Sequence, residues 1–183
     1  WFHNYEKRRN QLIQQQLKPE ESLNCMVLPD KFEIDLVAHE PDIMNPIDMT
    51  WDDRGRMLVA VTMDYPRIQK EGSDRVLLCE DKDGDGKADS FTTFAEGFSL
   101  ITGICWVNGG LILAQAPDMF FVKDTNGDDQ ADLYEKINTG WGTNDTHGGP
   151  SNLRYGLDNK IYGCVGGGGY VSGQTRFSGG IWR

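Results

Sequence analysis

One type of β-hairpin recurs three times, and this repeat limits most strongly what the chain can fold into. Each copy has a short apolar strand, a turn rich in Asp, Asn and Gly, and a second apolar strand, at residues 49–59, 104–113 and 153–162. Asp, Asn and Gly tolerate the positive φ angles that tight hairpin turns require. The chain is therefore expected to consist of repeated antiparallel hairpins.

A second type of hairpin lies between these copies. Apolar residues 76–78 lead into an acidic loop at 81–89 and a strand at 91–94, and residues 120–122 lead into an acidic loop at 124–132 and a strand at 133–137. Two hairpins per unit at a spacing of about 40 to 55 residues are typical of four-stranded propeller blades. The expected fold class is all-β, a partial β-propeller of about three blades, and a β-sandwich with decorated turns is the alternative. A propeller needs at least about four blades, so the chain is expected to be the first part of a longer protein, truncated at its C-terminus.

The first residues differ from this pattern. Residues 1–28 are expected to form an N-terminal helical or extended segment, and residues 29–183 the propeller blades. Leu12, Ile13 and Leu17 have helical spacing, and a second, short helical start follows at residues 19–22. From Phe32 to Val37 apolar and acidic residues alternate, which predicts a strand.

Composition narrows the classes of function. The chain has 183 residues, 38% hydrophobic and 25% charged, which is ordinary for a globular protein. Its formal net charge of -10 argues against nucleic acid or an anionic membrane as the main partner, because both would repel it. No apolar run is long enough for a transmembrane segment.

The four cysteines are widely spaced. They contain no CxxC or CxxCH pattern, which excludes a zinc knuckle or covalently attached haem within this stretch. Their spacing leaves disulfides and free thiols equally open. The cysteines are Cys25, Cys79, Cys105 and Cys164.

The two acidic loops have the oxygen spacing of calcium loops. Carboxylates at alternate positions point several oxygens at one centre, which a hard cation such as Ca²⁺ requires. The predicted donors in the first loop are Asp81, Asp83, Asp85, the Lys87 carbonyl and Asp89. Those in the second loop are Asp124, Asn126, Asp128, the Gln130 carbonyl, Asp132 and Glu135. The alternative is a pair of turns whose side chains accept backbone N–H groups and bind no metal.

Both loops depart from the helix-flanked calcium hand. Their flanking segments are expected to be strands, so the loops would cap hairpins. Thr92 stands where the first loop would have its closing glutamate, and Asp129 replaces the turn glycine of the second.

His147 lies in a glycine-flanked loop just before the third hairpin and is one of only three histidines. The loop is expected to place this histidine at the mouth of a sheet. An imidazole with an ordinary pKa near 6.5 suits acid–base chemistry, although plain turn formation would also explain the loop. The glycine run at residues 166–169 would let another surface approach the backbone closely.

The order of these pieces resembles the N-terminal domain of the PVC-type membrane-bound dehydrogenases, from about Pro19 to the C-terminus. The segments that carry the resemblance are LPDKFEIDLVAHEP, PIDMTWDDRGRMLVAVTMDYP and the run that begins GSDRVLLCEDKDGDGKADS and ends NDTHGGPSNLRYGLDNKIYG. That family is similar to the six-bladed propeller of soluble quinoprotein glucose and sorbosone dehydrogenases, often joined to a C-terminal c-type haem domain. The resemblance therefore implies a ring of six blades, with any haem outside this stretch.

The resemblance also implies a site. The matching positions are His147, Gly148, Gly149, Leu153, Gly156, Asp158, Ile161 and Tyr162. It implies that His147 is the base that takes a hydroxyl proton while hydride passes to pyrroloquinoline quinone, with Asp145 as an orienting residue or substrate contact. The basic residues that hold the quinone would lie on later blades.

Two hypotheses of function follow. The first is a quinoprotein-like dehydrogenase that oxidises a small-molecule sugar or alcohol in the periplasm or outside the cell. The second is a non-catalytic, calcium-stabilised propeller that binds a protein partner or glycans in an extracytoplasmic assembly. The net acidity fits both hypotheses.

Overall fold

The computed structural model describes residues 17–66, 72–166 and 180–183. The chain divides into two compact units, Trp1–Val37 and Ala38–Arg183. The predicted helix containing Leu12 and Ile13 lies outside the described residues.

The described part of the first unit contains one short helix, α2 (Pro19–Leu23). Proline at the helix start and glutamates in the first turn are favourable there, because the first N–H groups have no helical partner and attract negative charge. The strand predicted at residues 32–37 is wrong, because these residues form no regular structure. Phe32 is 68% exposed, and no described strand pairs with this segment. Alternation alone does not supply the pairing partner that a strand needs.

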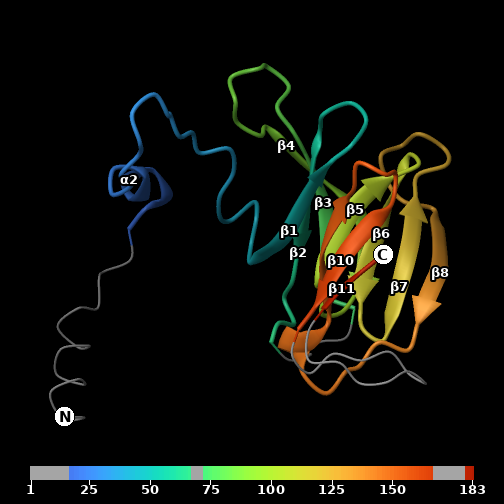
Figure 1. Cartoon of the computed structure of the whole chain (residues 1–183). Coiled ribbons are helices and arrows are strands. Elements are labelled where there is room, and N and C mark those ends of the chain that lie inside the picture. The colour runs from blue at the N-terminus through green and yellow to red at the C-terminus, as the bar shows by residue number, and fades with distance from the viewer. Residues whose placement is uncertain (1–16, 67–71, 167–179) are drawn as a thin grey trace, which may run out of the picture. The chain divides into compact units, whose positions relative to one another are not determined.

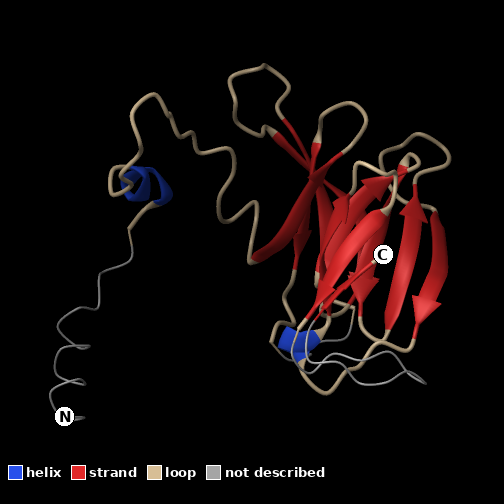
Figure 2. Ribbon diagram, viewed as in Figure 1, coloured by secondary structure: helices blue, strands red, loops and turns tan. Residues whose placement is uncertain are grey.

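The second unit consists of three antiparallel sheets (Figures 1 and 2). The first sheet has the order β1 (Pro46–Trp51), β2 (Met57–Val61), β3 (Asp74–Glu80) and β4 (Ser90–Phe98). The second sheet has the order β5 (Gly103–Val107), β6 (Gly110–Gln115), β7 (Asp118–Lys123) and β8 (Leu133–Thr139). The third consists of β9 (Pro150–Tyr155), β10 (Ile161–Val165) and β11 (Gly180–Trp182). Each predicted hairpin is therefore present.

The sheets succeed one another as propeller blades do. Each is a meander in which every strand pairs with the next along the chain. The first strand of the middle sheet, β5, contacts the first strands of both neighbours, β1 and β9. Strands that start each sheet thus lie side by side, and each sheet runs outward from them. The predicted fold class, an all-β partial propeller with a short N-terminal helical segment, is confirmed.

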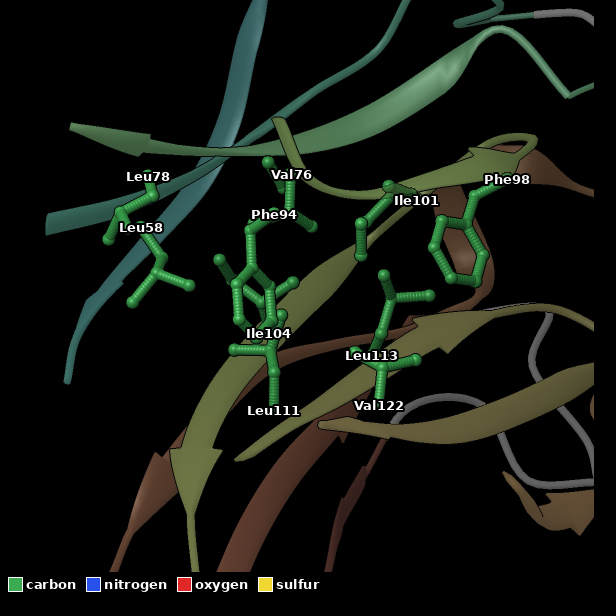
Figure 3. Packing of buried hydrophobic residues seen from close by; sticks show 12 residues of the cluster. Leu58, Val76, Leu78, Phe94, Phe98, Ile101, Ile104, Leu111, Leu113 and Val122 are labelled. Atoms are coloured by element: carbon green, nitrogen blue, oxygen red, sulfur yellow. The ribbon is translucent and has the colours of Figure 1, made fainter. Parts of the chain in front are cut away.

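Apolar side chains between successive sheets form two of the three buried clusters, and the third lies on the first sheet around Val59 and Leu77. The cluster between the first two sheets includes Leu58, Val76, Ile104 and Leu113, each fully buried (Figure 3). Burying one such side chain stabilises the fold by roughly 1.5 to 3 kcal/mol. A second cluster, which includes Met119 and the fully buried Leu153, joins the second and third sheets. These contacts fix the ends of the strands, and with them the loops that carry the candidate site.

All four cysteines are free thiols, with Cys79 and Cys105 buried. Burial raises the pKa of the Cys79 thiol to about 11, which keeps it protonated at neutral pH. Within the described residues, no helix is both long and apolar enough to cross a bilayer.

Candidate functional site

The histidine turn, η1 (Thr146–Gly148), lies between the last strand of the second sheet and the first strand of the third. In an antiparallel meander, alternate connections lie at the same end of the sheets. The turn therefore shares one end with the links that follow β2, β4 and β6, and the two acidic loops lie at the other end (Figures 1 and 2). The predicted catalytic and metal residues belong to opposite ends of the blades.

Asp145 fixes the histidine turn. As the N-cap residue it accepts a hydrogen bond at Oδ1 from the backbone N–H of His147, at 2.9 Å. The same oxygen lies 3.0 Å from Nδ1 of the His147 ring. These two hydrogen bonds, the backbone bond first, hold the pKa of the Asp145 carboxyl below its usual range. A single carboxylate thus holds both the backbone N–H and one ring atom of His147.

The His147 ring is open to solvent. Its side chain is 68% exposed, and no hydrogen bond to Nε2 occurs among the described residues. When the neutral ring donates its Nδ1–H to Asp145, the lone pair of the imidazole is on Nε2. The arrangement can therefore accept a proton from an approaching hydroxyl.

Tyr65 approaches this imidazole from the first blade. It belongs to the link after β2, and its ring centroid is 5.6 Å from that of His147 at an interplanar angle of 79°. Sequence reasoning did not identify Tyr65. The only sequence signal for Tyr65 is that it is an aromatic residue soon after a predicted strand. Many aromatic residues in such positions have no function.

A small pocket adjoins the histidine turn. Its enclosed volume is about 40 Å³. Its lining consists of Tyr65, Leu100, Thr102, Ala116, Gly142, Thr143, Asp145, Thr146 and Gly149. His147 itself is not part of this lining, but Asp145 and Tyr65, which both contact the imidazole, are. Two residues that line the pocket thus also contact the imidazole.

The first acidic loop gathers three of its predicted donors. Oxygens of Asp81, Asp83 and Asp89 lie within 4.8 Å of one another, on exposed side chains. Asp81 also accepts hydrogen bonds from the N–H groups of Gly86 (2.8 Å) and Gly84 (2.7 Å), which lower the pKa of its carboxyl. Three oxygens at this separation fit the first ligands of a Ca²⁺ ion.

Asp85 is not part of this group. Asp85 accepts the backbone N–H of Lys87 at 2.8 Å, which is a local side-chain-to-backbone bond of the kind that turns use.

The second acidic loop has the same pattern of hydrogen bonds: Asp124 accepts the N–H groups of Gly127 (2.6 Å) and Asp129 (2.8 Å), as Asp81 accepts those of Gly84 and Gly86. Asp132 accepts both the backbone N–H (2.8 Å) and the hydroxyl (2.7 Å) of Thr125, which lowers the pKa of its carboxyl. Asp124, Asn126 and Asp128 accept backbone N–H groups within the loop, the last from Gln130. Glu135 lies on β8 opposite Phe121. In the described part of the chain, only the first loop brings three carboxylates within 4.8 Å.

Arg56 connects the second loop to the first blade. Its guanidinium lies 2.8 Å from Asp52, 3.2 Å from Glu80 and 2.8 Å from Asp129. Asp129 adopts a φ of 65°, and the guanidinium lowers the pKa of its carboxyl. Asp129, which replaces the turn glycine, therefore forms an ion pair with Arg56 of another blade, 73 residues away in sequence. The residue spacing within the loop could not indicate this contact.

Comparison of the sequence with known protein families identifies the family of this chain. A family described as a domain of unknown function (DUF7133) matches residues 18–183. No curated protein matches the sequence. Among solved structures, a candidate gluconolactonase is similar with 14% identity and a TM-score of 0.48, over 74% of this chain and 47% of that one. A candidate oxidoreductase (glucose dehydrogenase) from Thermus thermophilus is similar with 16% identity and a TM-score of 0.46, over 66% of this chain and 39% of that one. The chain thus spans less than half the length of either structure.

Proposed function

We propose that this chain, which belongs to the DUF7133 family of domains of unknown function, supplies three blades and the catalytic base of a propeller dehydrogenase for a sugar or an alcohol. The observation that carries the proposal is the exposed His147 imidazole, oriented through Nδ1 by Asp145 at 3.0 Å. The sequence resemblance to PVC-type membrane-bound dehydrogenases supports the same residue as base. The proposed location is the periplasm or the cell exterior.

The chemistry assigned to these residues is removal of a proton. Oxidation of an alcohol removes the hydroxyl proton and a hydride from the carbon that bears the hydroxyl. Nε2 of His147 would take the proton, and the Asp145 carboxylate would stabilise the imidazolium that results, because a hydrogen bond between charged partners is stronger than a neutral one. Solvent exposure of the ring leaves room for the substrate to approach.

Pyrroloquinoline quinone is the hydride acceptor that the resemblance implies. Its carboxylates require cationic partners. The described lining of the pocket contains an acidic residue, Asp145, and neither lysine nor arginine. These residues do not fit the quinone by themselves, so no hydride step is assigned to them.

The proposal is tested on the full-length protein. It is reconstituted with pyrroloquinoline quinone and Ca²⁺, and dye reduction is followed with a panel of sugars and alcohols. His147→Ala should lower the rate about 10²- to 10⁴-fold, which is the usual contribution of a general base, and His39→Ala should retain it. A wild-type rate in His147→Ala would refute the assignment.

A non-catalytic, calcium-stabilised propeller is the second candidate. It is favoured by the group of Asp81, Asp83 and Asp89, which belongs to the end of the sheets opposite the histidine turn. A metal there would brace a hairpin without contact to His147. Calcium binding with no oxidation of any substrate would favour this candidate, in which the chain binds a protein partner or glycans.

A further inference from the structure

The imidazole of His147 has more than one possible orientation about its contact with Asp145. A hydrogen bond through Nδ1 restrains one ring atom, but the Asp145 side chain that accepts it is itself 53% exposed, so the two can move together as the χ1 and χ2 torsions of His147 change. The direction of Nε2, which would face a substrate, therefore needs a second constraint. Such a constraint has to come from a group that contacts the ring itself.

Tyr65 provides a contact of this kind. Its ring meets the imidazole nearly at a right angle, 79°, with a centroid separation of 5.6 Å. Rings in this edge-to-face arrangement attract each other because the positive edge of one meets the negative face of the other. A movement of the imidazole would lose this attraction, so the contact restricts the direction of Nε2.

The backbone that carries Tyr65 is itself held firmly. The N–H of Tyr65 lies 3.1 Å from Oγ1 of Thr62, which is fully buried at the end of the first blade. The fully buried Asp74 accepts the N–H of Met63 at 2.8 Å and, with its other oxygen, the N–H of Ile101 at 3.0 Å. One buried carboxylate thus joins the link of Tyr65 to the start of the second blade. A side chain on such a support can position another with precision.

We propose that Tyr65 is a positioning residue for His147, and that its ring sets the direction of Nε2 while forming a wall of the adjoining pocket. This inference rests on the proposed function, since it assigns the orientation of the proposed base. The contact crosses from the first blade to the third. The contact with Tyr65 is therefore formed only when the blades are packed together.

The test compares Tyr65→Phe with Tyr65→Leu in the full-length protein labelled with ¹⁵N-histidine. The His147 ring resonances are assigned by their loss in His147→Ala. Tyr65→Phe keeps the ring contact and should keep these resonances, whereas Tyr65→Leu should shift them. Tyr155→Leu, at an exposed tyrosine of β9, is the matched control and should leave them unchanged.

Kinetics provide the second readout. Tyr65→Leu should lower kcat by roughly two- to tenfold, which corresponds to the strength of one edge-to-face pair, with kcat restored in Tyr65→Phe. Unchanged His147 resonances in Tyr65→Leu would overturn the proposal, and so would a Tyr65→Phe variant that behaves like Tyr65→Leu. Resonances shifted by more than the loss of the Tyr65 ring current accounts for, in a protein that oxidises no substrate, would uphold the positioning role and count against the proposed function alone. Urea unfolding of both variants shows whether the resonances shift because the fold is lost. A shift that results from loss of the fold would also overturn the proposal.

Discussion

An alanine at Gly166 should displace the histidine turn, whereas an alanine at Gly149 should not. Gly166 follows β10, and its N–H lies 3.3 Å from the carbonyl oxygen of Gly148. A Cβ at Gly166 would be 3.0 Å from the His147 carbonyl oxygen and 3.1 Å from Cα of Gly148. A Cβ at Gly149 would meet nothing closer than Cγ2 of Thr102, at 3.9 Å. Gly149 follows the histidine turn and Gly166 contacts it, so alanine at these two positions makes a matched comparison.

The expected magnitudes follow from these contacts. Ordinary contacts begin at 3.4 Å, so the backbone around His147 must yield by about 0.3 to 0.4 Å, and backbone atoms cannot rotate away. Added bulk in a packed position destabilises by about 1 to 3 kcal/mol. Replacing glycine by alanine in an allowed conformation stabilises by about 0.4 to 1 kcal/mol, because the unfolded chain has fewer conformations. Gly149→Ala should therefore be more stable than Gly166→Ala by roughly 1 to 3 kcal/mol.

Urea unfolding and the ring resonances of His147 measure this difference. Gly166→Ala should lower the unfolding midpoint relative to Gly149→Ala and shift the His147 resonances. Equal midpoints for the two variants, together with unchanged resonances in Gly166→Ala, would refute the reasoning that β10 supports the turn.

Three further predictions concern charge. Removal of the guanidinium in Arg56→Met should cost roughly 2 to 4 kcal/mol, because the buried Asp52 carboxylate loses its ion-pair partner and keeps only two backbone N–H donors. Arg54→Met, at a side chain 72% exposed, should change the urea midpoint little. Calorimetric titration with CaCl₂ should detect one ion bound to the first acidic loop, lost in Asp83→Asn and kept in Asp132→Asn; loss in Asp132→Asn alone would contradict the grouping of carboxylates. The folded pKa of Asp145 is lowered, so its contribution to stability is complete above the ordinary carboxyl pKa of about 3.9 and is lost as pH falls through the lower folded value. Asp145→Asn should therefore lose less stability than wild type on acidification below about pH 4, and equal losses would contradict the hydrogen bonds assigned to Asp145.

The hairpins could be predicted because each depends on neighbouring residues. The turn at Asn108 and Gly109 adopts positive φ angles of 52° and 71°, as its sequence indicated. The order of the sheets followed from the repeat of such turns. The segment from Phe32 could not be predicted in the same way, because a strand exists only where a partner is present.

The contacts between blades were beyond sequence reasoning. Arg154 on β9 lies 3.4 Å from Asp48 on β1, which is 106 residues away in sequence. The pairing of Arg56 with Asp129 and of Tyr65 with His147 is of the same kind. Each depends on how sheets pack face to face, and no local pattern encodes that geometry. Asp145 and His147 could be paired from the sequence because they are two residues apart in one turn.

The proposed base requires an imidazole that donates through Nδ1 to Asp145 and has its lone pair on Nε2. A long-range ¹H–¹⁵N spectrum of the ¹⁵N-histidine protein, at a pH where the ring is neutral, reports the tautomer of His147 directly. We predict the Nδ1–H tautomer in the wild type and a shift toward Nε2–H in Asp145→Asn. An Nε2–H tautomer in the wild type, unaffected by Asp145→Asn, would contradict the account.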